Sequence, residues 1–582
     1  MDEQTIRERA EQYVAAEDNA VFRNEVEELL RNADYGELNE RFYTGLDFGT
    51  GGLRGVIGGG MNRMNTLVVQ RATQGLATYV KAHAGAGEPS AVIAYDSRRY
   101  SETFALDAAL VLCGNGIKTY LFSSLRPTPE LSFAVRRLKA TTGIVVTASH
   151  NPPQYNGYKV YWDDGGQVVS PHDKGIIEEV RKVESVTKTT RDQAIADGLL
   201  VLIDSEIDNA YRATVVAQSL RPDLVREKGG ELQVVYTPLH GTGGMLVDST
   251  LRELGVEVTF VEEQREPDGE FPTVDYPNPE ESSAMELALR KAKEIGADLV
   301  LGTDPDADRV GMAAPDGDTY RLLTGNQHGV LLADYVLGTH KELGTMPKNP
   351  AFIKTIVTTE LQRLVAESYG ATVHETLTGF KYIAAKIREF ESQPGGPTFV
   401  VGGEESYGFL VGTAVRDKDA VSAAAMTVEM ALYYRSQGKS LMERLNEIYR
   451  EHGYFEELLV SKYFEGSAGL EKMNAIMEHL RRNPPSTFAG QPVVAMKDYR
   501  EGTTTILSSG ETNKDIELPS SNVVQFFLGD SSIITARPSG TEPKIKFYAS
   551  CRAEAGTPLE DAKAKVDEKI ARITQELNRL GN

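Results

Sequence analysis

Three carboxylates stand at alternate positions in the segment Asp304-Pro-Asp306-Ala-Asp308. Because these negative charges are so close together, they repel one another and need either a cation or full solvation. The apolar run Leu299–Leu301 leads directly into the segment, which argues against a solvated acidic turn. If the segment is extended, alternate side chains point to one side, and such a cluster suits a hard ion that prefers oxygen ligands. We expect Asp304, Asp306 and Asp308 to bind Mg²⁺.

An EF-hand calcium loop begins in a similar way, but the pattern ends there. That loop needs glycine at its sixth position and glutamate at its twelfth. Arg309 and Pro315 occupy these positions here, so the calcium-loop interpretation fails.

Ser149 follows a β-branched run and is surrounded by small and polar residues. A serine hydroxyl is a weak nucleophile unless neighbours activate it, and His150 or Lys159 could in principle move its proton. The Gly-x-Ser-x-Gly elbow of serine hydrolases is absent, because Thr147 and Asn151 stand at the glycine positions. The simpler alternative is a serine that caps a helix or opens a turn. The serine alone favours that alternative, but the Gly, Asn, Tyr and Lys residues around it favour a reactive hydroxyl.

Two further motifs supply groups that suit a phosphorylated sugar. Arg537, Ser539, Gly540 and Thr541 offer a guanidinium fork, two hydroxyls and a flexible backbone, and Lys546 follows. These are donors for phosphate, although Pro538 could simply begin a turn there.

The second of these motifs lies in the glycine-bracketed segment 402–408. Glu404 and Ser406 are an acceptor and a donor at alternate positions, as sugar hydroxyls require. An ordinary polar loop is the competing interpretation.

Each motif follows a predicted strand. Up to about residue 440 the strands alternate with helical patterns, which is typical of βαβ units and largely parallel sheets. Ligands bind at the carboxyl ends of such strands, so we expect the motifs to share one cleft. The predicted strands in this part are 91–94, 143–147, 234–236, 299–301 and 399–401.

The two ends of the chain differ from this pattern. Residues 1 to about 40 predict one or two amphipathic helices. After about residue 450, two long helical patterns interrupt a series of strands, which predicts a separate α+β domain. Its predicted strands are 457–460, 493–496, 523–527, 532–536 and 545–549, and the last helix is 558–580.

Composition narrows the class of protein. The 582 residues carry a net charge of −22, which argues against nucleic acid as a partner. No apolar run approaches the roughly 18 residues of a membrane helix, and the N-terminus has no signal-peptide pattern. The only cysteines, Cys113 and Cys551, are far apart. We therefore expect a reduced, cytoplasmic protein with no membrane partner.

Taken together and in this order, the motifs resemble those of the α-D-phosphohexomutase superfamily along nearly the whole chain. Residues 147–152 are similar to its phosphoserine loop, 304–309 to its metal loop, 403–406 to its sugar loop and 537–541 to its phosphate loop. The serine-loop extension 153–159 and the helical N-terminal arm look most like the long phosphoglucomutase branch, which also contains phosphopentomutases. The sugar loop reads Glu-Glu-Ser-Tyr-Gly, unlike the Glu-x-Ser-Gly-His of many phosphomannomutases.

The resemblance implies an α/β fold. Three related α/β domains with mixed, largely parallel sheets and a C-terminal α+β domain of TATA-binding-protein-like fold would surround a central cleft. The expected segments are a helical arm (1–40), a phosphoserine domain (41–205), a metal domain (206–320), a sugar domain (321–450) and a phosphate domain (451–582).

The implied activity is the interconversion of α-D-glucose 1-phosphate and glucose 6-phosphate through phosphorylated Ser149, with Mg²⁺ as cofactor and glucose 1,6-bisphosphate as intermediate and activator. Phosphomannomutase or phosphopentomutase activity is the alternative, and the protein is expected to be a monomer or homodimer. The implied catalytic residues are Ser149, Lys159, His150 and Arg54, and the metal ligands are Ser149, Asp304, Asp306 and Asp308. The implied substrate-binding residues are Arg309, Gly379, Lys381, Glu404, Ser406, Lys418, Arg537, Ser539, Gly540, Thr541 and Lys546, with Arg98 and Arg416 adding positive field.

Two rival functions stay open on the sequence alone. A phosphatase would use the same cluster with water at the serine, while a kinase would need a nucleotide loop that is missing. A catalytically inactive sugar-phosphate sensor is the other rival, and the intact serine and aspartates argue against it.

Overall fold

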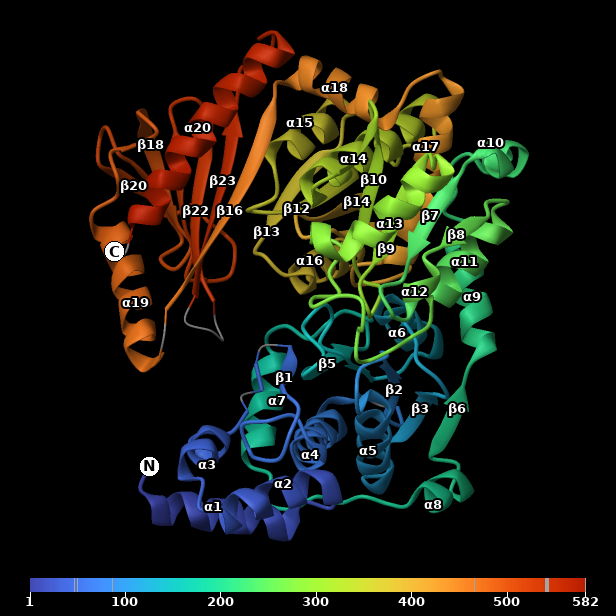
Figure 1. Cartoon of the computed structure of the whole chain (residues 1–582), viewed down its shortest axis with the longest axis vertical. Coiled ribbons are helices and arrows are strands. Elements are labelled where there is room, and N and C mark those ends of the chain that lie inside the picture. Colours follow the sequence, from blue (N-terminus) through green and yellow to red (C-terminus); the bar gives the residue numbers. More distant parts are fainter. Residues whose placement is uncertain (47, 50, 86, 465, 540–543, 581–582) are drawn as a thin grey trace. The chain divides into compact units, whose positions relative to one another are not determined.

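The computed structural model describes residues 1–46, 48–49, 51–85, 87–464, 466–539 and 544–580 (Figure 1). The chain divides into two compact units, each built from two stretches of sequence. The first unit is Met1–Gly325 with Phe380–Gln437, and the second is Asn326–Gly379 with Gly438–Asn582.

The N-terminal arm consists of three helices where the sequence predicted one or two: α1 (Glu3–Ala16), α2 (Ala20–Arg31) and α3 (Tyr35–Phe42). The side chains of Asp2, Asn19 and Asp34 each accept a backbone hydrogen bond at the start of one helix. These caps explain the breaks, because each satisfies an amide that a helix N-terminus leaves without a partner.

The first sheet has the strand order β1-β5-β4-β2-β3-β6. Strands β4, β2, β3 and β6 pair in parallel, and β5 and β1 join at one side in antiparallel fashion. All five residues of β4 are buried, as expected for a strand with both faces covered. The bounds are β1 (Gly52–Val56), β2 (Ser90–Tyr95), β3 (Lys118–Phe122), β4 (Thr142–Val146), β5 (Tyr155–Trp162), β6 (Leu200–Ile203), α4 (Thr66–His83), α5 (Ser101–Gly114), α6 (Thr128–Leu138), α7 (His172–Arg181) and α8 (Arg191–Ala196).

The second sheet has the order β11-β10-β9-β7-β8, with β8, β7 and β9 parallel and β10 and β11 antiparallel. Its strands are β7 (Val234–Thr237), β8 (Val258–Phe260), β9 (Leu299–Thr303), β10 (Val310–Asp316) and β11 (Thr319–Leu322). Its helices are α9 (Ser205–Val216), α10 (Pro222–Lys228), the 3-10 turn η1 (Gly229–Glu231), α11 (Gly243–Glu253), α12 (Glu262–Arg265) and α13 (Ser282–Ile295). The first unit ends with α16 (Phe380–Ser392), the antiparallel pair β14 (Thr398–Glu404) and β15 (Gly408–Val411), and α17 (Ala420–Ser436).

The second unit contains the parallel pair β12 and β13 and a C-terminal sheet in which every pair is antiparallel, ordered β16-β23-β22-β21-β18-β19-β20 with β17 beside β18. The helices are α14 (Gly325–Leu343), α15 (Glu360–Ser368), α18 (Leu441–His452), α19 (Gly466–Arg482) and α20 (Leu559–Arg579). The strands are β12 (Pro350–Thr355), β13 (Thr372–Thr376), β16 (Phe455–Tyr463), β17 (Thr487–Phe488), β18 (Gln491–Asp498), β19 (Thr503–Ile506), β20 (Glu511–Asn513), β21 (Val524–Leu528), β22 (Ile533–Pro538) and β23 (Lys544–Arg552).

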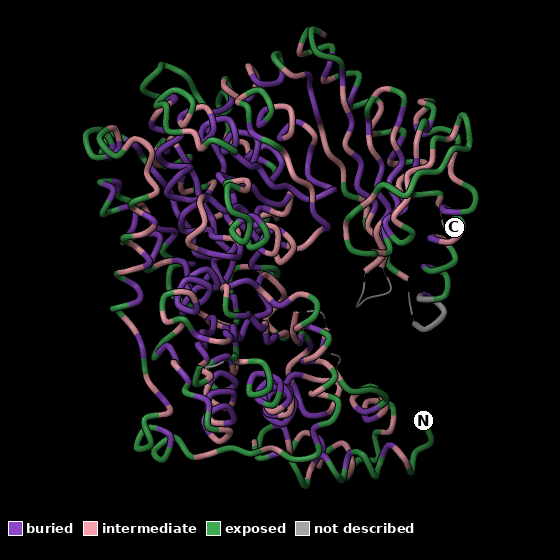
Figure 2. Tube along the Cα trace, turned by 180° about the vertical axis from the view of Figure 1, so that it is seen from behind, coloured by how far each residue is buried: buried purple, intermediate pink, exposed green. Residues whose placement is uncertain are grey.

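The predicted fold class is confirmed: α/β segments with mixed sheets precede a C-terminal α+β segment. Every strand named from the sequence forms, and α20 matches the predicted last helix. The inner sheet strands are buried, whereas exposed residues concentrate in connecting loops and on outer helix faces (Figure 2). Within the described ranges, no helix has both the length and the apolar character needed to cross a membrane.

One acidic side chain in the second unit makes its stability depend on pH. Glu457 on β16 accepts a hydrogen bond from Ser550 Oγ at 3.1 Å. Burial raises the pKa of Glu457 from 4.5 to about 7, against the hydrogen bonds from Thr359 and Ser550. The folded protein therefore holds this proton more tightly than the unfolded chain does. The resulting stabilisation is complete below pH 4.5 and is lost as the pH rises through about 7.

We predict that Glu457→Gln abolishes this loss of stability. Between about pH 5 and about pH 8, the free energy of unfolding of the wild type should fall by about 1–3 kcal/mol more than that of the variant. Urea unfolding followed by circular dichroism measures the difference. Glu456→Gln, on the opposite face of the same strand, controls for the loss of one negative charge. Equal pH dependence in Glu457→Gln and the wild type would contradict the assignment.

Candidate active site

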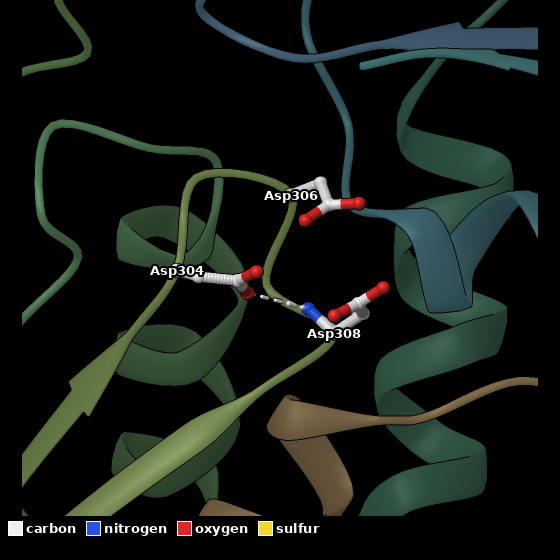
Figure 3. A group of neighbouring side chains, drawn as sticks. All are labelled: Asp304, Asp306 and Asp308. Carbon is white, nitrogen blue, oxygen red and sulfur yellow. Dashed lines mark hydrogen bonds between the residues drawn. The ribbon is translucent and has the colours of Figure 1, made fainter. Parts of the chain in front are cut away.

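The acidic motif forms a compact group at the end of β9. Asp304, Asp306 and Asp308 are all buried, and each contributes an oxygen that lies within 4.8 Å of the oxygens of the other two (Figure 3). The three carboxylates come from one loop and converge on a shared space. The predicted cluster therefore exists as a group of side chains.

The reason for the convergence differs from the one expected. The segment is a turn rather than an extended strand, and Ala307 has a positive φ of 48°. Asp304 Oδ1 accepts hydrogen bonds from the backbone amides of Asp308 (3.1 Å) and Arg309 (3.0 Å), as Figure 3 shows for Asp308. The turn folds back on the first aspartate, and this brings the three carboxylates together.

Two lysines from other parts of the first unit neutralise part of this charge. Lys159 Nζ on β5 lies 2.8 Å from Asp306 Oδ2 and 3.4 Å from Asp308 Oδ2. Lys418 Nζ lies 3.0 Å from Asp308 Oδ2 and 3.0 Å from Asp417 Oδ1. Burial alone would lower the pKa of each lysine, but the adjacent carboxylates raise it. Both side chains are therefore ammonium ions in this arrangement.

The aspartates respond in opposite directions. Burial, together with the charges of Asp306 and Asp308, raises the pKa of Asp304 well above its usual range. Burial also acts on Asp306, but Lys159 outweighs it and lowers the pKa of that carboxyl. Of these two aspartates, Asp304, which faces Ser149, therefore takes up a proton more readily than Asp306.

Ser149 lies at the edge of this cluster. Its Oγ donates to Asp304 Oδ2 at 2.7 Å and lies 3.1 Å from His150 Nδ1. The serine is buried and has a positive φ of 53°, a strained conformation for a residue with a side chain. Burial, followed by the charges of Arg309 and Arg54, lowers the pKa of His150 well below its usual range, so this imidazole is neutral.

Arg98 holds the serine loop in this conformation. Its guanidinium donates to the carbonyl oxygens of Ser149, Asn151, Pro152 (2.9 Å) and Tyr155 (3.1 Å). We expected Arg98 only to add positive field, but its donors are directed to the loop backbone. The hydrogen bonds explain how Ser149 remains in its strained conformation.

Arg416 also has a structural position. Its side chain is fully buried, donates to the carbonyl oxygens of Thr413 and Val415, and pairs with Glu391. Lys418, two positions later in the same loop, contacts Asp308 of the acidic cluster. Arg416 thus fixes the loop that carries Lys418.

The residues present fit a hard divalent cation such as Mg²⁺. Asp306 Oδ1 and Asp308 Oδ1 are buried and accept no hydrogen bond from any residue that the structure describes. Buried carboxylate oxygens without partners are costly. A cation with oxygen ligands would satisfy both atoms, and the group as a whole has the donor chemistry that Mg²⁺ prefers.

The predicted sugar-binding residues lie at the turn between β14 and β15. Glu404 is the last residue of β14 and is buried, while Ser406 is partly buried in the turn before β15. Burial alone would lower the pKa of Arg309, but nearby carboxylates raise it. The largest effect comes from Glu280, 2.6 Å away, and a smaller one comes from Glu404.

Arg54 and Lys381 complete the predicted residues of this unit. The exposed Arg54 donates to Asn151 Oδ1 at 3.3 Å, so it contacts the serine loop. Lys381 Nζ lies 5.2 Å from the centre of the Tyr382 ring. The first unit thus brings together Ser149, His150, Lys159, the aspartates and Lys418, with Arg54, Arg309 and Glu404 in their surroundings.

The predicted phosphate motif belongs to the second unit. Arg537 lies within β22, where it pairs with Lys546 of β23, so it is a strand residue and not part of a loop. Ser539 N donates to Lys544 O at 2.7 Å. Gly379 also belongs to this unit. Gly540 and Thr541 lie outside the described residues.

Two segments that the sequence analysis did not select hold the acidic loop. Thr128, at the start of α6, donates its hydroxyl to Asp306 Oδ2 (2.8 Å) and its amide to Asp306 O (2.9 Å). Thr242 donates its hydroxyl (2.9 Å) and amide (2.8 Å) to Pro305 O. Neither threonine has a sequence signal of its own, although His240-Gly-Thr-Gly-Gly contains the glycines that such close packing needs.

Gly241 provides that close packing. A Cβ at this position would lie 2.3 Å from Pro305 Cα and 2.6 Å from Pro305 O, so a side chain would displace the acidic loop. A Cβ at Gly244, three residues later, would have no neighbour nearer than 3.7 Å.

We predict that Gly241→Ala weakens binding of a divalent cation by about tenfold or more, because the displaced loop no longer aligns its carboxylates, whereas Gly244→Ala binds like the wild type. Electron paramagnetic resonance of Mn²⁺ in solution measures the free ion directly. Equal Mn²⁺ affinity in both variants would show that this packing does not position the ligands.

Comparison with known proteins gives the family. The models of phosphoglucomutase/phosphomannomutase α/β/α domains I, II and III match residues 45–187, 209–317 and 324–452. The domain boundaries expected from the sequence remain a prediction.

Curated relatives and solved structures agree. The phosphoglucomutase of Staphylococcus haemolyticus is 38% identical over 88% of this chain and 91% of its own, and that of Staphylococcus aureus (strain MRSA252) is 36% identical over 92% and 94%. The structure of pp63/parafusin (phosphoglucomutase) from Paramecium is similar in fold, with a TM-score of 0.69, 17% identity, and coverage of 93% of this chain and 96% of that one. The chain therefore belongs to the phosphoglucomutase/phosphomannomutase family, within the α-D-phosphohexomutase superfamily of isomerases.

Proposed function

We propose that this protein is a phosphoglucomutase, which interconverts α-D-glucose 1-phosphate and glucose 6-phosphate through a phosphorylated Ser149 and glucose 1,6-bisphosphate. The observation that carries the proposal is the 2.7 Å hydrogen bond from Ser149 Oγ to Asp304, within a cluster of three aspartates and two lysines. The choice of glucose is supported by curated relatives named phosphoglucomutase that are 36–38% identical.

The acidic cluster is the proposed site of the metal. Asp304, Asp306 and Asp308, with an oxygen of Ser149, would hold Mg²⁺. Bound there, the ion would neutralise charge on the phosphoryl group during transfer.

Phosphoryl transfer from the enzyme to the sugar begins at Ser149. A sugar hydroxyl oxygen attacks the phosphorus, the bond from phosphorus to Ser149 Oγ breaks, and one proton passes in net from the sugar hydroxyl to Ser149 Oγ. When Ser149 Oγ attacks a sugar phosphate in the reverse transfer, the neutral His150, 3.1 Å away, is suited to accept the serine proton, and it returns this proton when Oγ leaves.

We assign the proton of the sugar hydroxyl to Lys159. Its pKa is raised by Asp306 and Asp308, so at rest it carries a proton that it can donate when a sugar oxygen leaves. In the opposite step, the transfer from phosphorylated Ser149 to the sugar, this nitrogen starts without that proton and accepts the proton of the sugar hydroxyl. Arg54, which contacts the serine loop, is the fourth proposed catalytic residue.

Two motifs are proposed to bind the substrate. Glu404 and Ser406 would bind sugar hydroxyls, and Arg537 and Ser539 would bind the phosphate that is not transferred. Further proposed binding residues are Arg309, Gly379, Lys381, Lys418 and Lys546, together with Gly540 and Thr541, which are outside the described residues. Phosphomannomutase or phosphopentomutase activity is the alternative. The protein is further proposed to be a cytoplasmic monomer or homodimer whose partners are small sugar phosphates.

We predict that Ser149→Ala loses nearly all mutase turnover, because no oxygen remains to carry the phosphoryl group. The loss should exceed about a thousandfold. A coupled assay from glucose 1-phosphate to glucose 6-phosphate measures turnover, and intact-protein mass spectrometry should find one phosphate on a fraction of the wild type and none on the variant. Ser249→Ala, which removes a partly exposed hydroxyl of α11, is the control. Substantial turnover by Ser149→Ala would exclude the phosphoserine mechanism.

Substrate choice is tested by comparing 1-phosphates of glucose, mannose and ribose. We predict the highest kcat/KM for glucose 1-phosphate, with measurable turnover of mannose 1-phosphate, because a site that does not contact a hydroxyl discriminates little at that carbon. Glu404→Gln should reduce turnover of both hexoses and leave phosphorylation of Ser149 intact. A higher kcat/KM for ribose 1-phosphate would make the protein a phosphopentomutase with the same mechanism.

A further inference from the structure

The C-terminal part of the second unit contains a cavity that the proposed reaction does not use. Its volume is about 320 Å³, at the lower end of the range for pockets that hold small ligands. Three segments form its walls: the face of α20, the loop after β23, and the turn between β17 and β18. The lining residues are Ala489, Gln491, Arg552, Ala553, Glu554, Thr557, Lys565, Glu568, Lys569 and Arg572.

Helix α20 supplies most of the charge. Lys569 lies four residues after Lys565, and Arg572 lies three residues after Lys569. These three side chains therefore share one face of the helix. The buried positions Ala562 and Val566 lie on the adjacent strip, which packs toward the sheet. Helix α20 packs against β23 and β16, beside which it runs in Figure 1. The cationic face is therefore held in a fixed position beside the cavity.

Part of this positive charge already has a structural role. Lys569 Nζ donates to Arg552 O (2.8 Å) and pairs with Asp530 (2.5 Å). Arg572 pairs with Glu568 (2.5 Å). Lys569 and Arg572 therefore have ion-pair partners. The other two cations of the lining do not have such ion pairs among the residues that the structure describes.

Arg552 and Lys565 are the unexplained cations. Arg552 Cζ lies 5.3 Å from the centre of the Phe455 ring, and its buried Nε has no hydrogen-bond partner among the described residues. Lys565 is exposed at the rim and makes no ion pair within the described part of the chain. Arg552 and Lys565 are therefore the two cations of the cavity lining for which the described residues provide no ion pair.

The lining of the cavity thus contains four cations and two carboxylates. This local excess of positive charge stands out in a protein whose net charge is −22. A cavity wall can concentrate positive potential in this way and attract a small anion. Thr557 and Gln491 add neutral groups that can donate hydrogen bonds at the same site.

We propose that this cavity binds a small phosphate compound, either free phosphate or a phosphate monoester. Arg552 and Lys565 would contact the phosphate oxygens directly, and Arg572 would add charge from the same helix face. A guanidinium next to an ammonium suits the several acceptor oxygens of a phosphate. None of the lining residues belongs to the proposed catalytic or substrate-binding set, so this site is separate from the proposed reaction.

The test uses the full-length protein and the reactivity of one amine. Lys565 is exposed, so an amine-reactive acetylating reagent modifies it, and peptide mass spectrometry measures the rate. With inorganic phosphate or glucose 6-phosphate present, this rate should fall at least about threefold, because a bound anion covers the ammonium. Lys563, which lies on the same helix outside the cavity and pairs with Glu560, is the internal control and should keep its rate.

A variant checks that protection comes from the cavity. Arg572→Gln should raise the phosphate concentration that gives half-maximal protection of Lys565 by about tenfold, and Lys563→Gln should leave that concentration unchanged. Mutase turnover should be the same in both variants, so failure of this site and failure of the proposed reaction are distinguishable. Protection by phosphate but not by glucose 6-phosphate assigns the site to free phosphate. Labelling of Lys565 at one rate with and without phosphate, equal protection of Lys563, or stronger protection by citrate would overturn the proposal.

Discussion

Burying three carboxylates within 4.8 Å of one another is the constraint on which the rest of the first unit depends. Their mutual repulsion is strong where water cannot screen it. The fold reduces this repulsion by adding Lys159 from one sheet and Lys418 from a distant loop. It also directs two backbone amides at Asp304. Two carboxylate oxygens, on Asp306 and Asp308, still accept no hydrogen bond from the described chain, and they are the atoms that a cation would bind.

Strained backbone conformations occur in the loops of the site. Ser149, Ala307 and Tyr407 have positive φ values although none is glycine. Such conformations cost of order 1–3 kcal/mol each and persist only where surrounding contacts enforce them. Arg98 provides those contacts at the serine loop, and the bonds from Thr128 and Thr242 provide them at the acidic loop. The scaffold therefore stabilises loop conformations that the local sequence does not favour.

The electrostatics of the site also keep two proton-transfer groups in opposite states. His150 is neutral because burial and nearby arginines lower its pKa, while Lys159 is charged because two aspartates raise its pKa. One group can thus accept a proton while the other can donate one. Phosphoryl transfer between an oxygen of the enzyme and an oxygen of a sugar needs both properties.

The sequence by itself determined the fold class, the strands and the motifs at their ends, because hydrophobic periodicity and short-range residue patterns are local properties. It also identified Ser149 and the three aspartates as candidates. It was wrong about why the aspartates converge, since a turn at Ala307 has no strong local signal. Only the tertiary structure decided which cations face the cluster, because Lys418 and Asp308 are 110 positions apart and meet through packing. The same holds for Arg98, Thr128 and Gly241: their roles depend on backbone groups far away in the sequence, and no local pattern specifies those contacts.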